Sequence, residues 1–138
     1  MVFFKDEGSE FDAPLDKVWK LNQSEGDHNH PSLKNPNSSM DGEHPILSYE
    51  TQMPDGSWVK NKVRMSVFPP IGIIFETLEG PLKGSVSFQY YTPRGAKTGI
   101  TVVGEWKASG IPDAQLNAVG MKFLETVYNE DKANLAKM

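Results

Sequence analysis

The stretch from Pro112 to Met138, PDAQLNAVGMKFLETVYNEDKANLAKM, decides the fold of this chain. Its apolar residues recur at steps of three and four, which predicts one long helix with a single apolar stripe. The members of this stripe are Leu116, Val119, Phe123, Leu124, Val127, Tyr128 and Leu135. Such a helix is stable when its stripe lies on an apolar surface, so the preceding residues are expected to form that surface.

Strand-like segments fill most of the chain before this helix. Alternating patterns, with turn signals between them, predict strands at residues 46–53, 58–68, 71–79, 85–92 and 99–109. Residues 2–11 predict a first strand, and Asp12 and Pro14 predict the start of a short helix that ends near Gln23. The sequence therefore predicts an α+β fold in one domain, residues 1–138, with a curved antiparallel sheet of six to seven strands wrapped on the C-terminal helix.

The alternation within the strands predicts which side chains face the helix. Those expected on the helix side are Val59, Asn61, Val63, Met65, Val67, Val86, Phe88, Tyr90, Ile100, Val102, Gly104, Trp106 and Ala108. Intervening residues such as Lys60, Ser87 and Gln89 are polar and are expected to face water. One apolar and one polar face indicate a single sheet that is covered on one side.

Composition and charge exclude several classes of function. The net charge is −4, so no basic field attracts a nucleic acid backbone. There is no cysteine, which excludes disulfides and thiolate metal sites. The longest apolar runs are too short to span a membrane, and the N-terminus lacks the pattern of a signal peptide. These absences predict a cytoplasmic protein without integral membrane association.

All three histidines of the chain lie in residues 24–45, which lack periodicity and predict a long loop. His28, His30 and His44, with Asp27 nearby, could hold a divalent metal, or one imidazole could act as a general base. Alternatively they are solvated loop residues, because His-x-His without a third ligand at a defined spacing is a weak signal. We expect no metal and no cofactor, and the three histidines are the candidates for catalysis.

The residues predicted to face the helix also include candidates for a ligand pocket. Tyr49, Asn61 and Tyr90 could orient a ligand in a mostly apolar pocket, or could bond to neighbours within a packed core. The other candidates are Met65, Phe88, Trp106, Gly120, Phe123, Leu124 and Val127.

Two features of the long helix need separate treatment. Glycine inside a helix costs about 1 kcal/mol relative to alanine, so Gly120 indicates either a close approach of the sheet or space for a ligand. The charged residues near the C-terminal end predict a solvated face. They are Glu125, Glu130, Asp131 and Lys132.

The order of elements, with the motif Ala13-Pro14-x-x-x-Val18-Trp19, resembles that of the START-like (SRPBCC) superfamily of helix-grip proteins. This superfamily includes the Bet v 1 allergens, polyketide cyclases and dehydrases, and coenzyme Q-binding proteins. The resemblance covers essentially the whole chain and implies an incomplete barrel that encloses an apolar cavity against the last helix. It also implies binding of a small hydrophobic ligand, lipid- or polyketide-like, in that cavity.

Two other functions stay open at the level of sequence. One is an enzyme of the cyclase, dehydratase or hydrolase type, with His28, His30 or His44 at the mouth of the cavity. The other is a protein-interaction module similar to the co-chaperone branch of the superfamily, which would use the exposed face of the sheet. The superfamily has no universal catalytic motif, so the resemblance assigns no catalytic residue.

Overall fold

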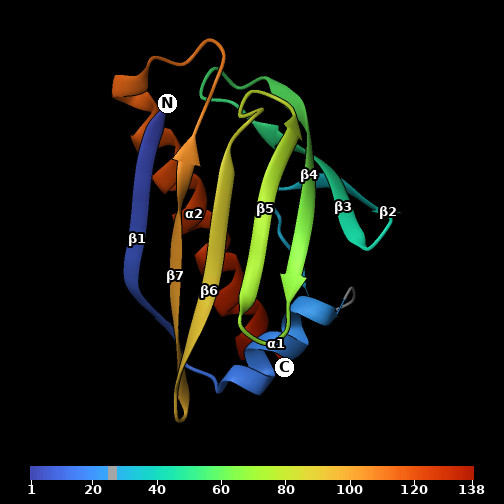
Figure 1. The fold of residues 1–138 in the computed structure, drawn as a ribbon, viewed down its shortest axis with the longest axis vertical. Helices are drawn as coiled ribbons and strands as arrows, with labels where there is room; N and C mark the ends of the chain where they lie inside the picture. The colour runs from blue at the N-terminus through green and yellow to red at the C-terminus, as the bar shows by residue number, and fades with distance from the viewer. Residues whose placement is uncertain (25–27) are drawn as a thin grey trace.

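The computed structural model describes residues 1–24 and 28–138, which form one seven-stranded sheet and two helices. In chain order the elements are β1 (Val2–Phe11), α1 (Leu15–Gln23), β2 (Lys34–Asp41), β3 (His44–Gln52), β4 (Trp58–Phe68), β5 (Gly72–Glu79), β6 (Val86–Arg94), β7 (Lys97–Trp106) and α2 (Asp113–Ala136). Neighbouring strands are antiparallel, in the order β1-β7-β6-β5-β4-β3-β2. The predicted α+β helix-grip fold is confirmed, and Figure 1 shows α2 crossing one face of the curved sheet.

Aromatic side chains hold α2 against the β1–β7 edge of this sheet. Trp106 on β7 stacks on Phe4 of β1, with ring centroids 4.2 Å apart and an interplanar angle of 10°. Phe11 at the end of β1 packs against Tyr128 of α2, with ring centroids 5.1 Å apart. The Tyr128 hydroxyl also donates a hydrogen bond to the carbonyl oxygen of Glu10. The core therefore lies between α2 and the β1–β7 half of the sheet.

The short helix α1 packs against α2, near the C-terminal end of α2. The expectation that Asp12 caps this helix is wrong, because the N-cap residue is Pro14 and the helix has no side-chain hydrogen bond from its N-cap. The turn before α1 is instead fixed by buried Thr98, whose hydroxyl donates to the carbonyl oxygen of Ala13 at 2.8 Å. Neither helix in the described part of the chain has the length and apolar character needed to cross a membrane.

Gly120 marks a close approach of α2 to the sheet. A Cβ atom at this position would lie 2.3 Å from Cε2 of Trp106. The indole cannot readily move aside, because it is 5% exposed and stacked on Phe4. Of the two reasons expected for this glycine, close packing is therefore right, and the space beside it is filled by the indole ring.

The register of β6 reverses one expectation about the face that meets the helix. Gln89 pairs directly with Val102, a buried residue of the core. Directly paired residues of antiparallel strands share a face, so Gln89 is on the helix side and its neighbours Phe88 and Tyr90 are on the outer side. The prediction that Phe88 and Tyr90 line a pocket under the helix is therefore wrong. The strand carries aromatic residues on its outer face, so alternation alone selected the wrong side.

Residues 34–41 form the edge strand β2, where the sequence predicts a loop. This strand pairs with β3 on one side, and all of its residues are exposed. Because neither face is buried, no apolar alternation marks it in the sequence. A turn at Pro31 precedes this strand, since the amide of Leu33 donates to the carbonyl oxygen of His30 at 2.9 Å.

Replacing Gly120 by alanine tests the contact with Trp106. We expect Gly120→Ala to lower the free energy of unfolding by about 1–3 kcal/mol, the usual cost of overpacking a core. This loss is expected although alanine is favoured over glycine in helices by about 1 kcal/mol. Urea denaturation followed by circular dichroism measures the change.

Asn117→Ala, at an exposed position of the same helix, is the matched control and should be neutral or slightly stabilising. A gain in stability for Gly120→Ala would mean that the helix is free to accept a methyl group there, and the close contact would be refuted.

Candidate functional site

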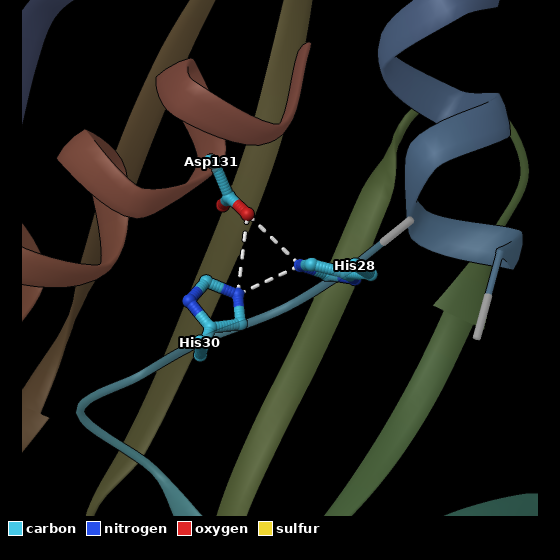
Figure 2. A group of neighbouring side chains, drawn as sticks. All are labelled: His28, His30 and Asp131. Carbon is cyan, nitrogen blue, oxygen red and sulfur yellow. Dashed lines mark hydrogen bonds and ion pairs between the residues drawn. The ribbon is translucent and has the colours of Figure 1, made fainter. Parts of the chain in front are cut away.

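Two histidines that follow α1 meet the C-terminal half of α2. The Nε2 atoms of His28 and His30 lie 2.9 Å and 3.2 Å from Oδ1 of Asp131. The same two nitrogen atoms are 2.7 Å from each other. Figure 2 shows the two imidazoles on one segment of the chain and the carboxylate reaching toward them from α2. Three side chains thus bring three polar atoms to one point.

Other side chains of α2 dock the same segment, residues 28–33, which we call the histidine loop. The carboxylate of Glu130 accepts hydrogen bonds from Nδ1 of His30 at 3.0 Å and from the amide and hydroxyl of Ser32 at 2.9 Å and 2.7 Å. The side-chain amide of Asn134 donates to the carbonyl oxygen of Asn29 at 2.8 Å. The loop is therefore held to the helix along its length.

The prediction that Glu130 and Asp131 lie on a solvated face is wrong. Their side chains are 14% and 12% exposed, because the histidine loop covers this part of the helix. Burial alone raises the pKa of Asp131, but the hydrogen bonds and positive charges of His28 and His30 outweigh it and hold that pKa below its usual range. The carboxylate is therefore the stable form of Asp131 in this site.

The neighbouring carboxylates also act on His30. Burial alone lowers the pKa of this imidazole, but hydrogen bonds to Asp131 and Glu130 and their negative charges raise it above its ordinary value. Glu130 fixes the tautomer as well, because a carboxylate accepts hydrogen bonds and Nδ1 of His30 must carry the proton. In neutral His30, the nitrogen that faces Asp131 and His28 is then free of hydrogen.

The cluster could support two kinds of chemistry. Two imidazole nitrogens and a carboxylate oxygen are donor atoms that divalent transition metals accept. Without a metal, an imidazole beside a carboxylate can bind and release a proton near neutral pH. Asp131 of α2 is the carboxylate that lies beside both histidines.

The third histidine does not join this group. His44 is the first residue of β3, and its Nδ1 lies 3.2 Å from the carbonyl oxygen of Met65 and 3.3 Å from the hydroxyl of Ser66. The expectation that all three histidines form one cluster is therefore wrong. Asp27, the acidic residue expected near them, lies outside the described residues.

A small cavity of ≈30 Å³ lies between α2 and the β1–β7 half of the sheet. Its lining residues are Asp6, Ser9, Gln89, Ile100, Val102, Leu124, Val127, Tyr128 and Asp131. This volume holds about one water molecule and no organic ligand. Two predicted pocket residues, Leu124 and Val127, face it.

A larger cleft of ≈400 Å³ opens at the N-terminal half of α2. It lies between the β3–β4 turn, the loop before α2 and the first turns of that helix. Its lining residues are Met53, Pro54, Asp55, Ser57, Val59, Gly110, Ile111, Gln115 and Val119. Most of these belong to turns and loops, which have no periodicity that would predict a shared face. The exceptions are Val59 of β4 and Gln115 and Val119 of α2, of which the patterns place Val59 and Val119 toward the interior.

The other predicted pocket residues lie outside the linings of these two cavities. Trp106 and Gly120 form the packed contact described above. Asn61 is tied into the sheet, with its side-chain amide donating to the hydroxyl of Thr51 at 2.9 Å and to the carbonyl oxygen of Val59 at 3.2 Å. This supports a structural role for Asn61. Tyr49, Met65 and Phe123 are partly buried and line neither cavity.

No family model and no curated protein matches the chain, whereas many solved structures share its fold. TTHA0849 from Thermus thermophilus has a TM-score of 0.79 at 13% identity, over 99% of this chain and 98% of that one. The di-domain ARO/CYC StfQ from the steffimycin biosynthetic pathway has a TM-score of 0.76 at 18% identity, over 99% of this chain and 51% of that one. Ara h 8.0201 has a TM-score of 0.73 at 14% identity, over 98% of both chains. These likenesses confirm the helix-grip fold that the resemblance implies.

Tyr49 offers a test of burial on the concave side of β3. Burial raises its pKa to about 12, so the folded protein holds this proton more tightly than the unfolded chain does. The resulting stabilisation is complete below about pH 10 and is lost as the pH rises toward about 12. Tyrosinate absorbance during an alkaline titration should show a late component that Tyr49→Phe removes. Burial also raises the pKa of Tyr91, so a second late component should remain. A titration unchanged by Tyr49→Phe would contradict this assignment.

Glu130 offers a test of how the histidine loop is docked. We expect Glu130→Gln to weaken three hydrogen bonds made to a charged acceptor and to destabilise the protein by about 1–3 kcal/mol. Amide hydrogen exchange should speed up at Ser32 and change little in β6 and β7. Glu125→Gln, at an exposed position of the same helix, is the matched control. Equal exchange at Ser32 in both variants would show that Glu130 does not hold the loop.

Proposed function

We propose that this chain binds a small hydrophobic ligand, lipid- or polyketide-like, in the cleft between the sheet and the N-terminal half of α2. The main support for this proposal is the size of the cleft. Its ≈400 Å³ falls within the range of small-molecule pockets, about 300–1,000 Å³. The cavity under the middle of the helix is too small for this role.

The lining of the cleft has the composition that ligand pockets usually have, mostly apolar with a few polar groups. Met53 and Val59 beside the β3–β4 turn, Ile111 before α2 and Val119 in α2 supply apolar surface. A ligand held there would bring together groups that are far apart in the chain and would shield them from water. The apolar area removed from water would drive binding, at roughly 25 cal/mol per Å².

Polar groups at the rim restrict the kind of ligand. The carboxylate of Asp55 accepts hydrogen bonds from the amide and hydroxyl of Ser57 at 2.9 Å and 2.6 Å, which lowers its pKa. It is therefore negatively charged at neutral pH and disfavours an anionic head group. Gln115 offers a neutral amide that can donate and accept hydrogen bonds. We expect a ligand with an uncharged polar end.

The solved structures of similar fold add general support. StfQ is named as an ARO/CYC protein of a biosynthetic pathway, and Zhui of Streptomyces as an aromatase/cyclase. At 18% and 14% identity, these likenesses favour a ligand-binding fold and no particular reaction.

The enzyme alternative has less support than ligand binding. A catalytic base has to come within hydrogen-bond reach of the reacting atom. His28 and His30 bond to Asp131, and the cavity that Asp131 lines has space for about a water molecule. The larger cleft lies at the other half of the helix, where no histidine contributes to its lining.

Filling the cleft with a large side chain tests the proposal. The uncharged dye Nile red should bind the wild-type protein with increased fluorescence, and Val119→Trp should weaken this binding at least about tenfold, a loss of about 1.4 kcal/mol. Lys122→Trp, at an exposed position of the same helix, is the matched control and should bind like wild type. Circular dichroism checks that both variants fold.

Ile71→Ser removes an exposed apolar side chain far from the cleft lining, and it should leave dye binding unchanged. Loss of binding in Ile71→Ser or Lys122→Trp, with Val119→Trp unaffected, would place the dye on the outer surface and refute the proposal.

A further inference from the structure

We propose that His28, His30 and Asp131 form a binding site for one divalent transition-metal ion. The three side chains offer two imidazole nitrogens and one carboxylate oxygen to a common point. This site is independent of the ligand cleft, whose lining includes none of the three residues.

The distances between the three donor atoms fit a metal site. A metal about 2.1 Å from each ligand holds neighbouring ligands about 3.0 Å apart in octahedral geometry and about 3.4 Å apart in tetrahedral geometry. The observed separations are 2.7 Å between the two Nε2 atoms, and 2.9 Å and 3.2 Å from these atoms to Oδ1 of Asp131. The donors therefore already occupy one triangular face of a coordination shell.

Hydrogen bonding alone leaves this arrangement incomplete. Nδ1 of His30 donates to Glu130, so Nε2 of neutral His30 presents a lone pair to the carboxylate oxygen of Asp131. His28 can place one proton among the three atoms, through its Nε2. A pair of facing lone pairs then remains at 3.2 Å. A cation above the plane of the three donor atoms, within bonding distance of each, satisfies all three at once.

The surroundings of the cluster have the features of an outer coordination shell. Histidines that bind metals usually donate their other N–H group to a carboxylate or carbonyl, which orients the ring. The bond from His30 to Glu130 has this geometry, and Ser32 holds the same carboxylate with two further hydrogen bonds. Asn134 fixes the backbone between the two histidines by bonding to the carbonyl oxygen of Asn29. The ligands are thus positioned before a metal arrives.

The donor set limits the kind of metal. Two imidazoles and one carboxylate suit Zn²⁺, Fe²⁺, Co²⁺ or Ni²⁺, whereas Mg²⁺ and Ca²⁺ prefer sites made of oxygen. Three protein ligands leave at least one position for water or another small ligand. The site therefore differs from the closed four-ligand sites that serve structure alone.

Zinc titration of the metal-stripped protein tests the proposal, with protein purified without a polyhistidine tag. Isothermal calorimetry should show one Zn²⁺ per chain for wild type. His30→Gln and Asp131→Asn should each weaken binding at least about 100-fold, more than the 10–100-fold expected for the outer-shell change Glu130→Gln. His44→Gln removes a histidine outside the cluster and is the matched control, so its affinity should equal that of wild type.

A second measurement is independent of the variants and of their folding. NMR spectra of the histidine rings in wild-type protein should change at His28 and His30 on addition of Zn²⁺, with His44 unaffected. Folded wild-type protein that binds no Zn²⁺ would overturn the proposal and leave the cluster as a metal-free dock for the histidine loop. Equal loss of affinity in His44→Gln and His30→Gln would overturn it too.

Discussion

The contact between Gly120 and Trp106 fixes where α2 lies on the sheet, and much of the structure depends on that position. The indole is buried and stacked on Phe4, so the helix can approach β7 closely where it lacks a Cβ atom. Seated there, α2 packs on β1 and β7 at one side of the sheet. The β3–β4 turn, at the other side, lines the cleft together with Gln115 and Val119 of the helix. Gly120 therefore allows close packing of α2 on β7, and the cleft lies beside Val119 of the same helix.

Local patterns predicted the elements of the fold well where one face is buried and the other is solvated. The helix expected at residues 112–138 is present at Asp113–Ala136, because its apolar stripe has a sheet to lie on. The same reasoning failed for β6, where Phe88 and Tyr90 on the outer face look like core residues. It also missed β2, which has no buried face at all. Alternation of polar and apolar residues reveals a strand and its orientation when the buried face is apolar and the solvated face is polar.

The histidine cluster could be predicted in part. The spacing of His28 and His30 indicated that they could act together, but their partners lie about 100 positions later in the chain. In the helix, Glu130 and Asp131 lie between Tyr128 and Leu135 of the apolar stripe, and their charge predicts exposure to water. The histidine loop buries both carboxylates, and its side chains and the backbone amide of Ser32 bond to them. Tertiary contacts between polar segments leave no periodic trace in the sequence, and this limits what sequence reasoning can say about such sites.

The burial of these two carboxylates explains why the loop is held so closely. A buried charge is costly unless it is paired and hydrogen-bonded, and removing one partner leaves the other unsatisfied. Glu130 has three donors, and Asp131 lies beside two imidazoles. The loop therefore docks through complementary polar groups rather than through apolar area, so its order depends on the charge state at its centre. A bound cation would strengthen this dock, because it replaces shared protons with a permanent charge.

The cleft and the histidine cluster lie on opposite halves of one rigid element. Val119 in the cleft and Asp131 in the cluster are twelve residues apart, or about 18 Å along a helix. Between them, Trp106 fills the space beside Gly120, and the small cavity beyond it has room for about a water molecule. The linings of the cleft and of the small cavity have no residue in common. Because sites this far apart without shared partners usually contribute additively, binding in the cleft and binding at the cluster can be studied as separate properties of the chain.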